Sequence, residues 1–229
     1  MSDQINYVFI HGAGGTDSKW REIKPYFKDK QATYLNLPGR KDKKEITVQT
    51  IEDYAKEVAK EITDETILVG HSMGGLIGLE VAKNNPLING LVLVASSYEL
   101  PVHPSILASF AKGEFPEFLF KASYTKEIST ELLNQEEAEK TNIPSEITHQ
   151  DFVACNTYQA GKETLQSLQI PVLALFGSED KLLGKDTEEK LIEANPQIQI
   201  NKITGEKHYL ILESPKQVSD IIRSFSKNC

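Results

Sequence analysis

Apolar residues recur along the chain in short runs that have the length of buried strands. The runs cover residues 6–10, 32–37, 67–70, 90–95, 171–176 and 198–203. Short runs that are rich in Val, Ile, Leu and Phe are typical of strands buried on both faces of a parallel sheet. The sequence therefore predicts six strands.

Between most of these runs the apolar residues change to a helical spacing. The clearest case is Thr50 to Ile62, where they recur at intervals of three and four residues. Further helices are expected over residues 18–27, 185–194 and 215–226. Another is expected over the apolar run that begins at Leu76 and ends at about Asn84. Strands that alternate with helices predict an α/β fold with a doubly wound, mostly parallel sheet of six strands.

The alternation stops between Ser96 and about Gly161. This stretch contains four prolines and eight aromatic residues, and the rest predicts short helices such as Ser129 to Glu139. It is too long for a simple loop and too apolar for a linker. We expect a single domain with a core of residues 1–95 and 162–229 and a helical lid of residues 96–161 over the active edge of the sheet. A peripheral helical subdomain without a role in substrate binding is the alternative.

A serine with glycine two positions before and two positions after lies between the third strand and the helix that follows it. The stretch reads Gly70-His71-Ser72-Met73-Gly74-Gly75. This is the G-x-S-x-G pattern of a nucleophile elbow, in which the serine occupies a strained turn that presents its hydroxyl at the helix N-terminus. The glycines lack the Cβ atoms that would collide in so tight a bend. Because three fixed residues also arise by chance, the strand–turn–helix context carries the interpretation.

The first strand ends in a second glycine-rich turn, His11-Gly12-Ala13-Gly14-Gly15. One interpretation is a phosphate-binding loop, but neither dinucleotide nor P-loop spacing fits, and the P-loop lysine is absent. The other is a loop that directs a main-chain N–H at the oxygen of a reacting carbonyl. The nucleophile elbow downstream favours the second interpretation.

A serine nucleophile needs a base, and the base needs a third group to orient it. In this type of fold the expected order is serine, acid, histidine. Ser72, Asp180 and His208 occur in that order, each directly after a predicted strand. Glu179 and Glu99 are the competing acids.

The other four histidines are not expected to act as the catalytic base. His11 and His71 flank the predicted site, and we expect them to be structural hydrogen-bonding residues rather than bases. His103 and His149 lie in the lid without the spacing of metal ligands, so no metal site is expected.

Taken with Phe9-Ile10-His11-Gly12 and Gly177-Ser178-Glu179-Asp180, these motifs resemble the α/β-hydrolase superfamily in its small, esterase-like branch. The resemblance covers nearly the whole chain apart from the lid. It implies Ser72 as nucleophile, His208 as general base and then acid, Asp180 as the orienting acid, and an oxyanion hole made by the N–H groups of Met73 and Ala13. The N-terminal strand hairpin that is usual in this superfamily is expected to be missing, because only a few residues precede the first strand.

The function expected from this resemblance is hydrolysis of carboxylic esters of small to medium size through an acyl-enzyme on Ser72. The expected substrate contacts come from the first turn and from the aromatic residues of the lid: His11, Gly12, Phe110, Phe115, Phe118 and Tyr124. Two alternatives stay open. One is a C–C bond hydrolase or lyase of the same fold, of the menaquinone-pathway type, and the other is a non-enzymatic ligand receptor.

Charge and composition exclude several classes of partner. The net charge of −8 over 229 residues argues against binding to nucleic acid or to an anionic membrane surface. The two cysteines give neither a disulfide framework nor metal-ligand spacing. No signal peptide precedes the first strand, so we expect a cytoplasmic protein, a monomer or small homo-oligomer, that needs no cofactor.

Overall fold

A computed structural model describes residues 6–28, 30–40, 48–140 and 143–229. Its centre is one sheet of six parallel strands in the order β2-β1-β3-β4-β5-β6. The strands are β1 (Asn6–Ile10), β2 (Ala32–Leu35), β3 (Thr66–His71), β4 (Ile88–Val94), β5 (Val172–Gly177) and β6 (Gln199–Ile203). This confirms the predicted doubly wound α/β fold. Among the described residues β1 is the first strand; the residues before it, on which the expected absence of an N-terminal hairpin depends, lie outside the described range.

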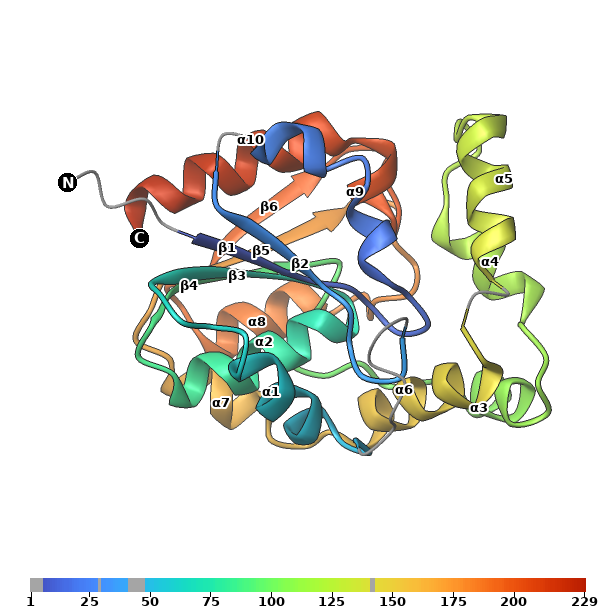
Figure 1. Cartoon of the computed structure of the whole chain (residues 1–229), viewed down its shortest axis with the longest axis horizontal. Coiled ribbons are helices and arrows are strands. Elements are labelled where there is room, and N and C mark those ends of the chain that lie inside the picture. Colours follow the sequence, from blue (N-terminus) through green and yellow to red (C-terminus); the bar gives the residue numbers. More distant parts are fainter. Residues whose placement is uncertain (1–5, 29, 41–47, 141–142) are drawn as a thin grey trace.

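Helices cover both faces of the sheet because alternate residues of each strand point to opposite faces. Val8 and Ile10 belong to one apolar cluster, with α1 (Ile51–Ala59) and α2 (Met73–Asn84), whereas Tyr7 and Phe9 belong to a second. The remaining helices that flank the sheet are α7 (Gly161–Ser167), α8 (Thr187–Ala194), α9 (Leu210–Glu213) and α10 (Pro215–Phe225). Figure 1 shows α10 on one face and α1, α2, α7 and α8 on the other.

The helix expected over residues 18–27 is wrong. The structure has two short 3-10 helices instead, η1 (Asp17–Trp20) and η2 (Lys24–Phe27). Pro25 explains the difference, because it has no N–H to donate and its ring clashes with the carbonyl four residues earlier in an α-helix. Trp20 and Phe27 nevertheless pack into the second apolar cluster.

Between β4 and β5 the chain forms four helices that lie outside the sheet layers. They are α3 (Pro104–Ala111), α4 (Glu117–Ser123), α5 (Thr130–Glu139) and α6 (Ser145–Thr157). Figure 1 shows them at the end of the sheet to which the strands point. The expected helix near Ser129 is confirmed as α5, with the Ser129 hydroxyl accepting the Leu132 N–H at its N-terminus. That this segment acts as a lid stays a prediction.

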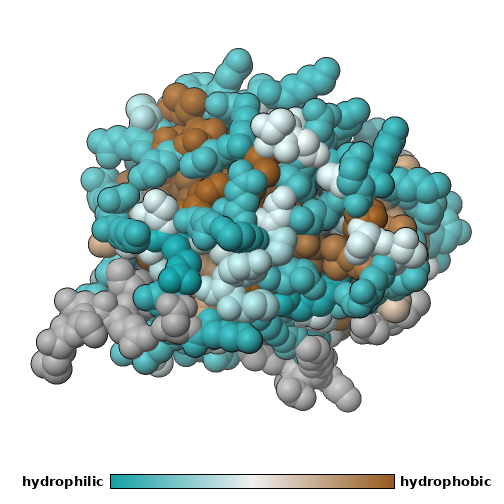
Figure 2. Space-filling model, turned by 90° about the horizontal axis from the view of Figure 1, so that it is seen from above, coloured by the Kyte–Doolittle hydropathy of each residue, from teal (hydrophilic) through white to brown (hydrophobic). Residues whose placement is uncertain are grey.

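The surface seen in Figure 2 is mostly hydrophilic. Hydrophobic residues show there in separate patches between hydrophilic ones. In the part of the chain that the structure describes, no helix combines the length and the apolar character needed to cross a membrane.

Candidate active site

Ser72 occupies the turn between β3 and α2 in a strained conformation. Its φ of 52° and ψ of −121° lie outside the regions that L-residues favour. The bend is possible because Gly70 and Gly74 have no Cβ atoms. A Cβ atom on Gly70 would lie 2.2 Å from the Gly74 oxygen, and one on Gly74 would lie 2.2 Å from the Ile10 oxygen. The neighbouring strand holds the turn, since the Ser72 N–H donates to the Val94 oxygen at 2.9 Å. The structure therefore has the strand–turn–helix geometry expected from the sequence.

Asp180 and His208 meet at the carboxyl ends of β5 and β6. His208 Nδ1 lies 2.8 Å from Asp180 Oδ2, so Nδ1–H donates to the carboxylate and Nε2 is left as the possible base. The other oxygen of Asp180 accepts the Leu182 N–H at 2.9 Å. Burial opposes ionisation of Asp180, but the charge of His208 and these hydrogen bonds outweigh it and hold the pKa of Asp180 below its usual value.

The two competing acids lie elsewhere. Glu179 is exposed, and only its backbone N–H takes part in the loop contact, donating to the Glu206 oxygen at 2.9 Å. Glu99 is paired with Lys190 at 2.8 Å. Thus only Asp180 of these three carboxylates contacts His208.

His71 forms a hydrogen bond with the backbone of His208. His71 Nε2 lies 3.0 Å from the main-chain oxygen of His208 and, as the donor, leaves Nδ1 buried without a hydrogen-bond partner among the described residues. Burial first, and then the neighbouring His208, lower the pKa of His71 to about 3. His71 is therefore neutral at pH 7 and acts as a hydrogen-bonding residue, as the sequence predicted.

His11 has a similar structural role in the first turn. Its Nδ1 lies 2.8 Å from the Gly12 oxygen, and its Nε2 accepts the Leu37 N–H at 3.2 Å. Burial, reinforced by the charge of Arg40, lowers the pKa of His11 well below its usual value. His11 is fully buried and does not line the cavity described below, so the structure does not bring it to a position of substrate contact.

The turn Gly12–Gly15 lies directly beside Ser72. A Cβ atom on Gly12 would be 3.1 Å from the Ser72 Cβ, and the Gly15 N–H closes the turn on the Gly12 oxygen at 3.2 Å. Within the described chain the Ala13 N–H has no hydrogen-bond partner. The Met73 N–H is the first of α2 and has no partner inside that helix. Ala13 lines the cavity described below, whereas Met73 is fully buried and is not among the lining residues, so the oxyanion hole stays a prediction.

A cavity of about 250 Å³ brings these elements together. Ser72 and His208 line it on one side, with Gly12 and Ala13, and the opposite wall comes from the segment between β4 and β5. That wall is largely apolar and includes Val102, Ile106, Phe115, Leu119, Phe120, Tyr124 and Phe152. The hydrogen bonds of the described residues do not include one between Ser72 Oγ and His208; in free enzymes this bond is often long and tightens when substrate binds.

The structure separates the predicted aromatic contacts into two groups. Phe115 and Tyr124 line the cavity, but Phe110 and Phe118 do not. Phe118 is 54% exposed to solvent, and Phe110 is buried where its ring stacks on Phe152, with centroids 5.0 Å apart. For Phe110 and Phe118 the structure thus gives no support to substrate contact.

A model of the alpha/beta hydrolase family matches residues 7–221. The chain belongs to the alpha/beta hydrolase family. Over 95% of its length this hydrolase is 21% identical to the biotin biosynthesis bifunctional protein BioHC of Teredinibacter turnerae, of which the match spans 44%. It is 22% identical to the pimeloyl-[acyl-carrier protein] methyl ester esterase of Yersinia pseudotuberculosis, with 96% of this chain and 92% of that protein covered.

The fold of this hydrolase is also similar to solved structures. A lipase-esterase related protein from Clostridium acetobutylicum superposes with a TM-score of 0.84 at 21% identity, covering 98% of this chain and 95% of that one. At this identity the likeness supports the fold alone.

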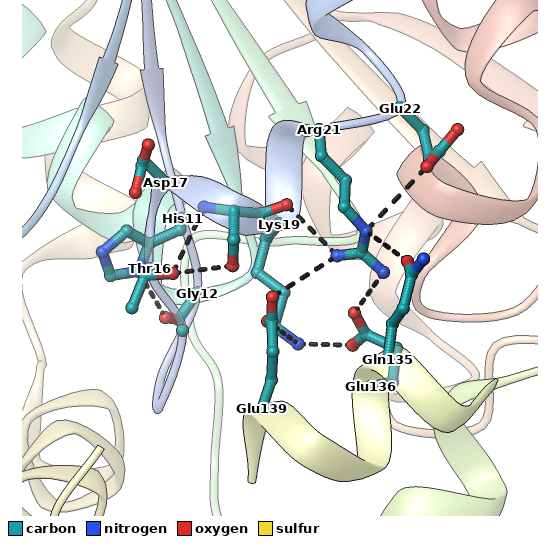
Figure 3. Close-up of polar contacts among 12 residues, drawn as sticks. His11, Gly12, Thr16, Asp17, Lys19, Arg21, Glu22, Gln135, Glu136 and Glu139 are labelled. Carbon is teal, nitrogen blue, oxygen red and sulfur yellow. Dashed lines mark hydrogen bonds and ion pairs between the residues drawn. The ribbon is translucent and has the colours of Figure 1, made fainter. Parts of the chain in front are cut away.

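A buried charged cluster forms part of the hydrolase cavity wall and was missed from the sequence. Glu136 of α5 is 1% exposed and pairs with Lys19 and, at 2.7 Å, with Arg21, which both lie at η1 (Figure 3). Burial opposes the charge on Lys19, yet Tyr209, Glu136 and Glu139 together raise its pKa. Burial likewise opposes the charge on Glu136, but Lys19 lowers its pKa. Both groups are therefore ionised at neutral pH.

The sequence carried no signal for this cluster. Glu136 lies in a helix with many charged residues, which is normally a solvated face, and its partners are more than a hundred residues away. Leu119 and Leu182 of the cavity wall carry no sequence signal of their own, and Phe120 and Phe152 are distinguished in the sequence only as two of the eight aromatic residues between Ser96 and Gly161. Among the described residues no group of His, Cys, Asp and Glu side chains is arranged to hold a metal ion.

Proposed function

We propose that this chain is a serine hydrolase that cleaves carboxylic esters of small to medium size through an acyl-enzyme on Ser72. One observation carries the proposal: His208, whose Nδ1 lies 2.8 Å from Asp180 Oδ2, lines the same cavity as a serine held at a φ of 52°. A strained serine beside an oriented imidazole is costly to maintain in a fold and is typical of nucleophilic catalysis.

In the first half of the reaction Ser72 Oγ attacks the ester carbonyl carbon while His208 Nε2 takes the hydroxyl proton. The carbonyl oxygen becomes an oxyanion, which the N–H groups of Ala13 and Met73 stabilise by about 3 kcal/mol each. The C–O bond to the alcohol then breaks, and His208 gives its proton to the leaving alcohol.

In the second half a water molecule loses a proton to His208 and attacks the acyl carbon. The second tetrahedral intermediate collapses, the carboxylic acid leaves, and the proton on His208 returns to Ser72 Oγ. Asp180 keeps Nδ1 protonated and stabilises the imidazolium in both halves.

The cavity wall favours an apolar acyl group. Leu119, Phe120 and Phe152 bury alkyl surface without offering hydrogen bonds, and a volume of about 250 Å³ suits a short or medium acyl chain. The names of relatives that hydrolyse a methyl ester agree with ester cleavage, and no feature of the described site singles out one alcohol.

Labelling with a fluorophosphonate, read by intact mass and peptide mapping, tests the proposal. We expect one adduct on Ser72, absent from Ser72→Ala and strongly slowed in His208→Ala, and turnover of p-nitrophenyl butyrate that both substitutions abolish. Full esterase activity in Ser72→Ala would overturn the assignment of the nucleophile. Ester turnover without any adduct, together with cleavage of a β-diketone, would instead indicate a C–C hydrolase or lyase.

A further inference from the structure

Helix α6 packs on the two glycine turns that follow β1 and β2. A Cβ atom on Gly14 would lie 2.9 Å from Thr148 Cγ2, and one on Gly39 would lie 3.0 Å from Ile147 Cδ1. Both glycines have positive φ, 63° and 85°, which other residues rarely adopt. The helix therefore lies against the backbone of the turn that carries Ala13.

Asp151, one helical turn after Ile147, makes the polar part of this contact. Its Oδ2 accepts the Gly14 N–H at 2.8 Å and also a hydrogen bond from Arg40 Nη2, while its Oδ1 accepts the Tyr54 hydroxyl at 2.6 Å. Thus a carboxylate from the segment between β4 and β5 binds the main chain of the turn next to Ser72.

Arg40 extends the same contact to two more backbone positions. Its Nε donates to the Gly15 oxygen at 3.1 Å and its Nη1 donates to the Pro38 oxygen at 2.7 Å. Asp151 and Arg40 are both completely buried, so the pair is shielded from water and from salt. Together they hold the Gly14 N–H and the Gly15 oxygen of one turn and the Pro38 oxygen of the next.

A buried ion pair is an expensive way to attach a helix, since apolar contacts of the same size would attach it as well or better. It does, however, fix direction, because charge-assisted hydrogen bonds to backbone groups allow only a narrow range of geometries. In the turn Gly12–Gly15, Asp151 holds the N–H of Gly14, the residue after the proposed oxyanion donor, and leaves the Ala13 N–H unbonded within the described chain.

We propose that Asp151 is a positioning residue that, with Arg40, holds the turn Gly12–Gly15 so that the Ala13 N–H faces the reacting carbonyl oxygen. The inference rests on the proposed serine hydrolase function. It makes α6 a support of the oxyanion hole: without the Asp151 contact, the turn that carries the Ala13 N–H loses its attachment to the segment between β4 and β5.

The test compares Asp151→Ala with a matched control, Glu80→Ala, in the full chain. Glu80 of α2 also connects the end of α6 and helix α7 to the core, since its Oε1 accepts the Tyr158 hydroxyl at 2.7 Å and the Thr164 hydroxyl at 3.0 Å. These hydrogen bonds involve neither of the glycine turns after β1 and β2. The first readouts are kcat and KM for p-nitrophenyl butyrate. The others are two inhibition constants: that of phenylboronic acid, whose serine adduct places an oxygen in the oxyanion hole, and that of butyrate, a ground-state ligand.

We expect Asp151→Ala to lower kcat by about 10- to 100-fold and to raise the inhibition constant of phenylboronic acid by the same factor, as for a displaced oxyanion donor. KM and butyrate inhibition should change by less than about threefold. Glu80→Ala should leave the ratio of phenylboronic acid to butyrate inhibition as in the wild type, whatever it does to the melting temperature.

Equal losses of phenylboronic acid and butyrate affinity, or an unchanged kcat in Asp151→Ala, would overturn the inference and leave Asp151 a structural residue. If Asp151→Ala does not fold, Asp151→Asn takes its place; its amide oxygen still accepts the Gly14 N–H, and a selective loss of about three- to tenfold is then expected. Failure of the proposed function looks different, because the wild type itself would show no Ser72-dependent turnover and no Ser72 adduct.

Discussion

Asp180 and His208 come from loops 28 positions apart in sequence, and their Oδ2 and Nδ1 atoms lie 2.8 Å apart. The pairing follows from the parallel sheet, because β5 and β6 are neighbours and their carboxyl ends meet at one edge. Gly177 allows the close approach, since a Cβ atom there would lie 2.3 Å from the Glu206 oxygen. The side chain of Asp180 is thereby 1% exposed and directed at the imidazole.

Substitution of the two adjacent acids separates their roles. Asp180→Asn should lower kcat for p-nitrophenyl butyrate by about 10³- to 10⁴-fold, because an amide favours the wrong imidazole tautomer and cannot stabilise the imidazolium. Glu179→Gln, whose side chain is exposed, should change kcat by less than about twofold. Steady-state kinetics at pH 7.5 measure both, and the opposite ranking would assign the acid to Glu179.

The lowered pKa of Asp180 also makes a prediction about stability. A carboxylate whose pKa is lower in the folded chain stabilises the fold fully above its unfolded pKa of about 3.8, and this contribution is lost as pH falls toward the folded value. The melting temperature of the wild type should therefore exceed that of Asp180→Asn at pH 6, and the difference should shrink below about pH 4. Calorimetry checks this, and a difference that grows on acidification would contradict an ionised Asp180 in the folded chain.

Ser72, Asp180 and His208, the proposed nucleophile, acid and base, could be identified as candidates because each lies in a short local pattern in the loop or turn after a strand. The contacts of the segment between β4 and β5 were not, because they depend on how separate helices dock. Phe118 and Phe120 show the limit: two positions apart on α4, they face opposite sides, and the sequence does not say which side meets the cavity. Asp151 and Glu136 show the same limit for charge, since polar residues on helices are normally solvated.

The two faces of α4 allow a paired test of substrate preference. Phe120→Ala removes an aromatic ring from the cavity wall and should raise the ratio of kcat/KM for p-nitrophenyl octanoate over butyrate by about tenfold, the scale of one or two methylene groups accommodated. Phe118→Ala should leave this ratio unchanged because Phe118 faces solvent. A change of ratio in Phe118→Ala alone would place the acyl group outside the cavity.

His71 should make the fold sensitive to mild acid. The pKa of His71 is about 3 in the folded chain and 6.5 in the unfolded chain. Between these pH values the unfolded chain binds one more proton, so the free energy of unfolding decreases as the pH is lowered. The loss between pH 7 and pH 5 is on the order of 2 kcal/mol for one such group. His71→Asn removes this titration, and urea unfolding at both pH values should show a smaller decrease than in the wild type. An equal decrease would mean that other groups, such as buried His11, dominate the response.

The cluster of Lys19, Arg21 and Glu136 joins α5 to the core beside the cavity, and its energetics follow from its burial (Figure 3). Glu136→Gln removes the buried carboxylate that Lys19 and Arg21 share and leaves them only the more distant Glu139, at 3.1 Å and 3.7 Å, which should cost about 3 kcal/mol in the free energy of unfolding. Glu137→Gln removes the neighbouring, half-exposed carboxylate that pairs with Lys140 and should cost under about 1 kcal/mol. Adding Lys19→Met to Glu136→Gln should restore part of the loss, since it removes a buried cation that has lost its nearer carboxylate. Urea unfolding of these three variants and of Lys19→Met alone measures these differences, and additive losses in the double variant would show that Lys19 and Glu136 are not energetically coupled.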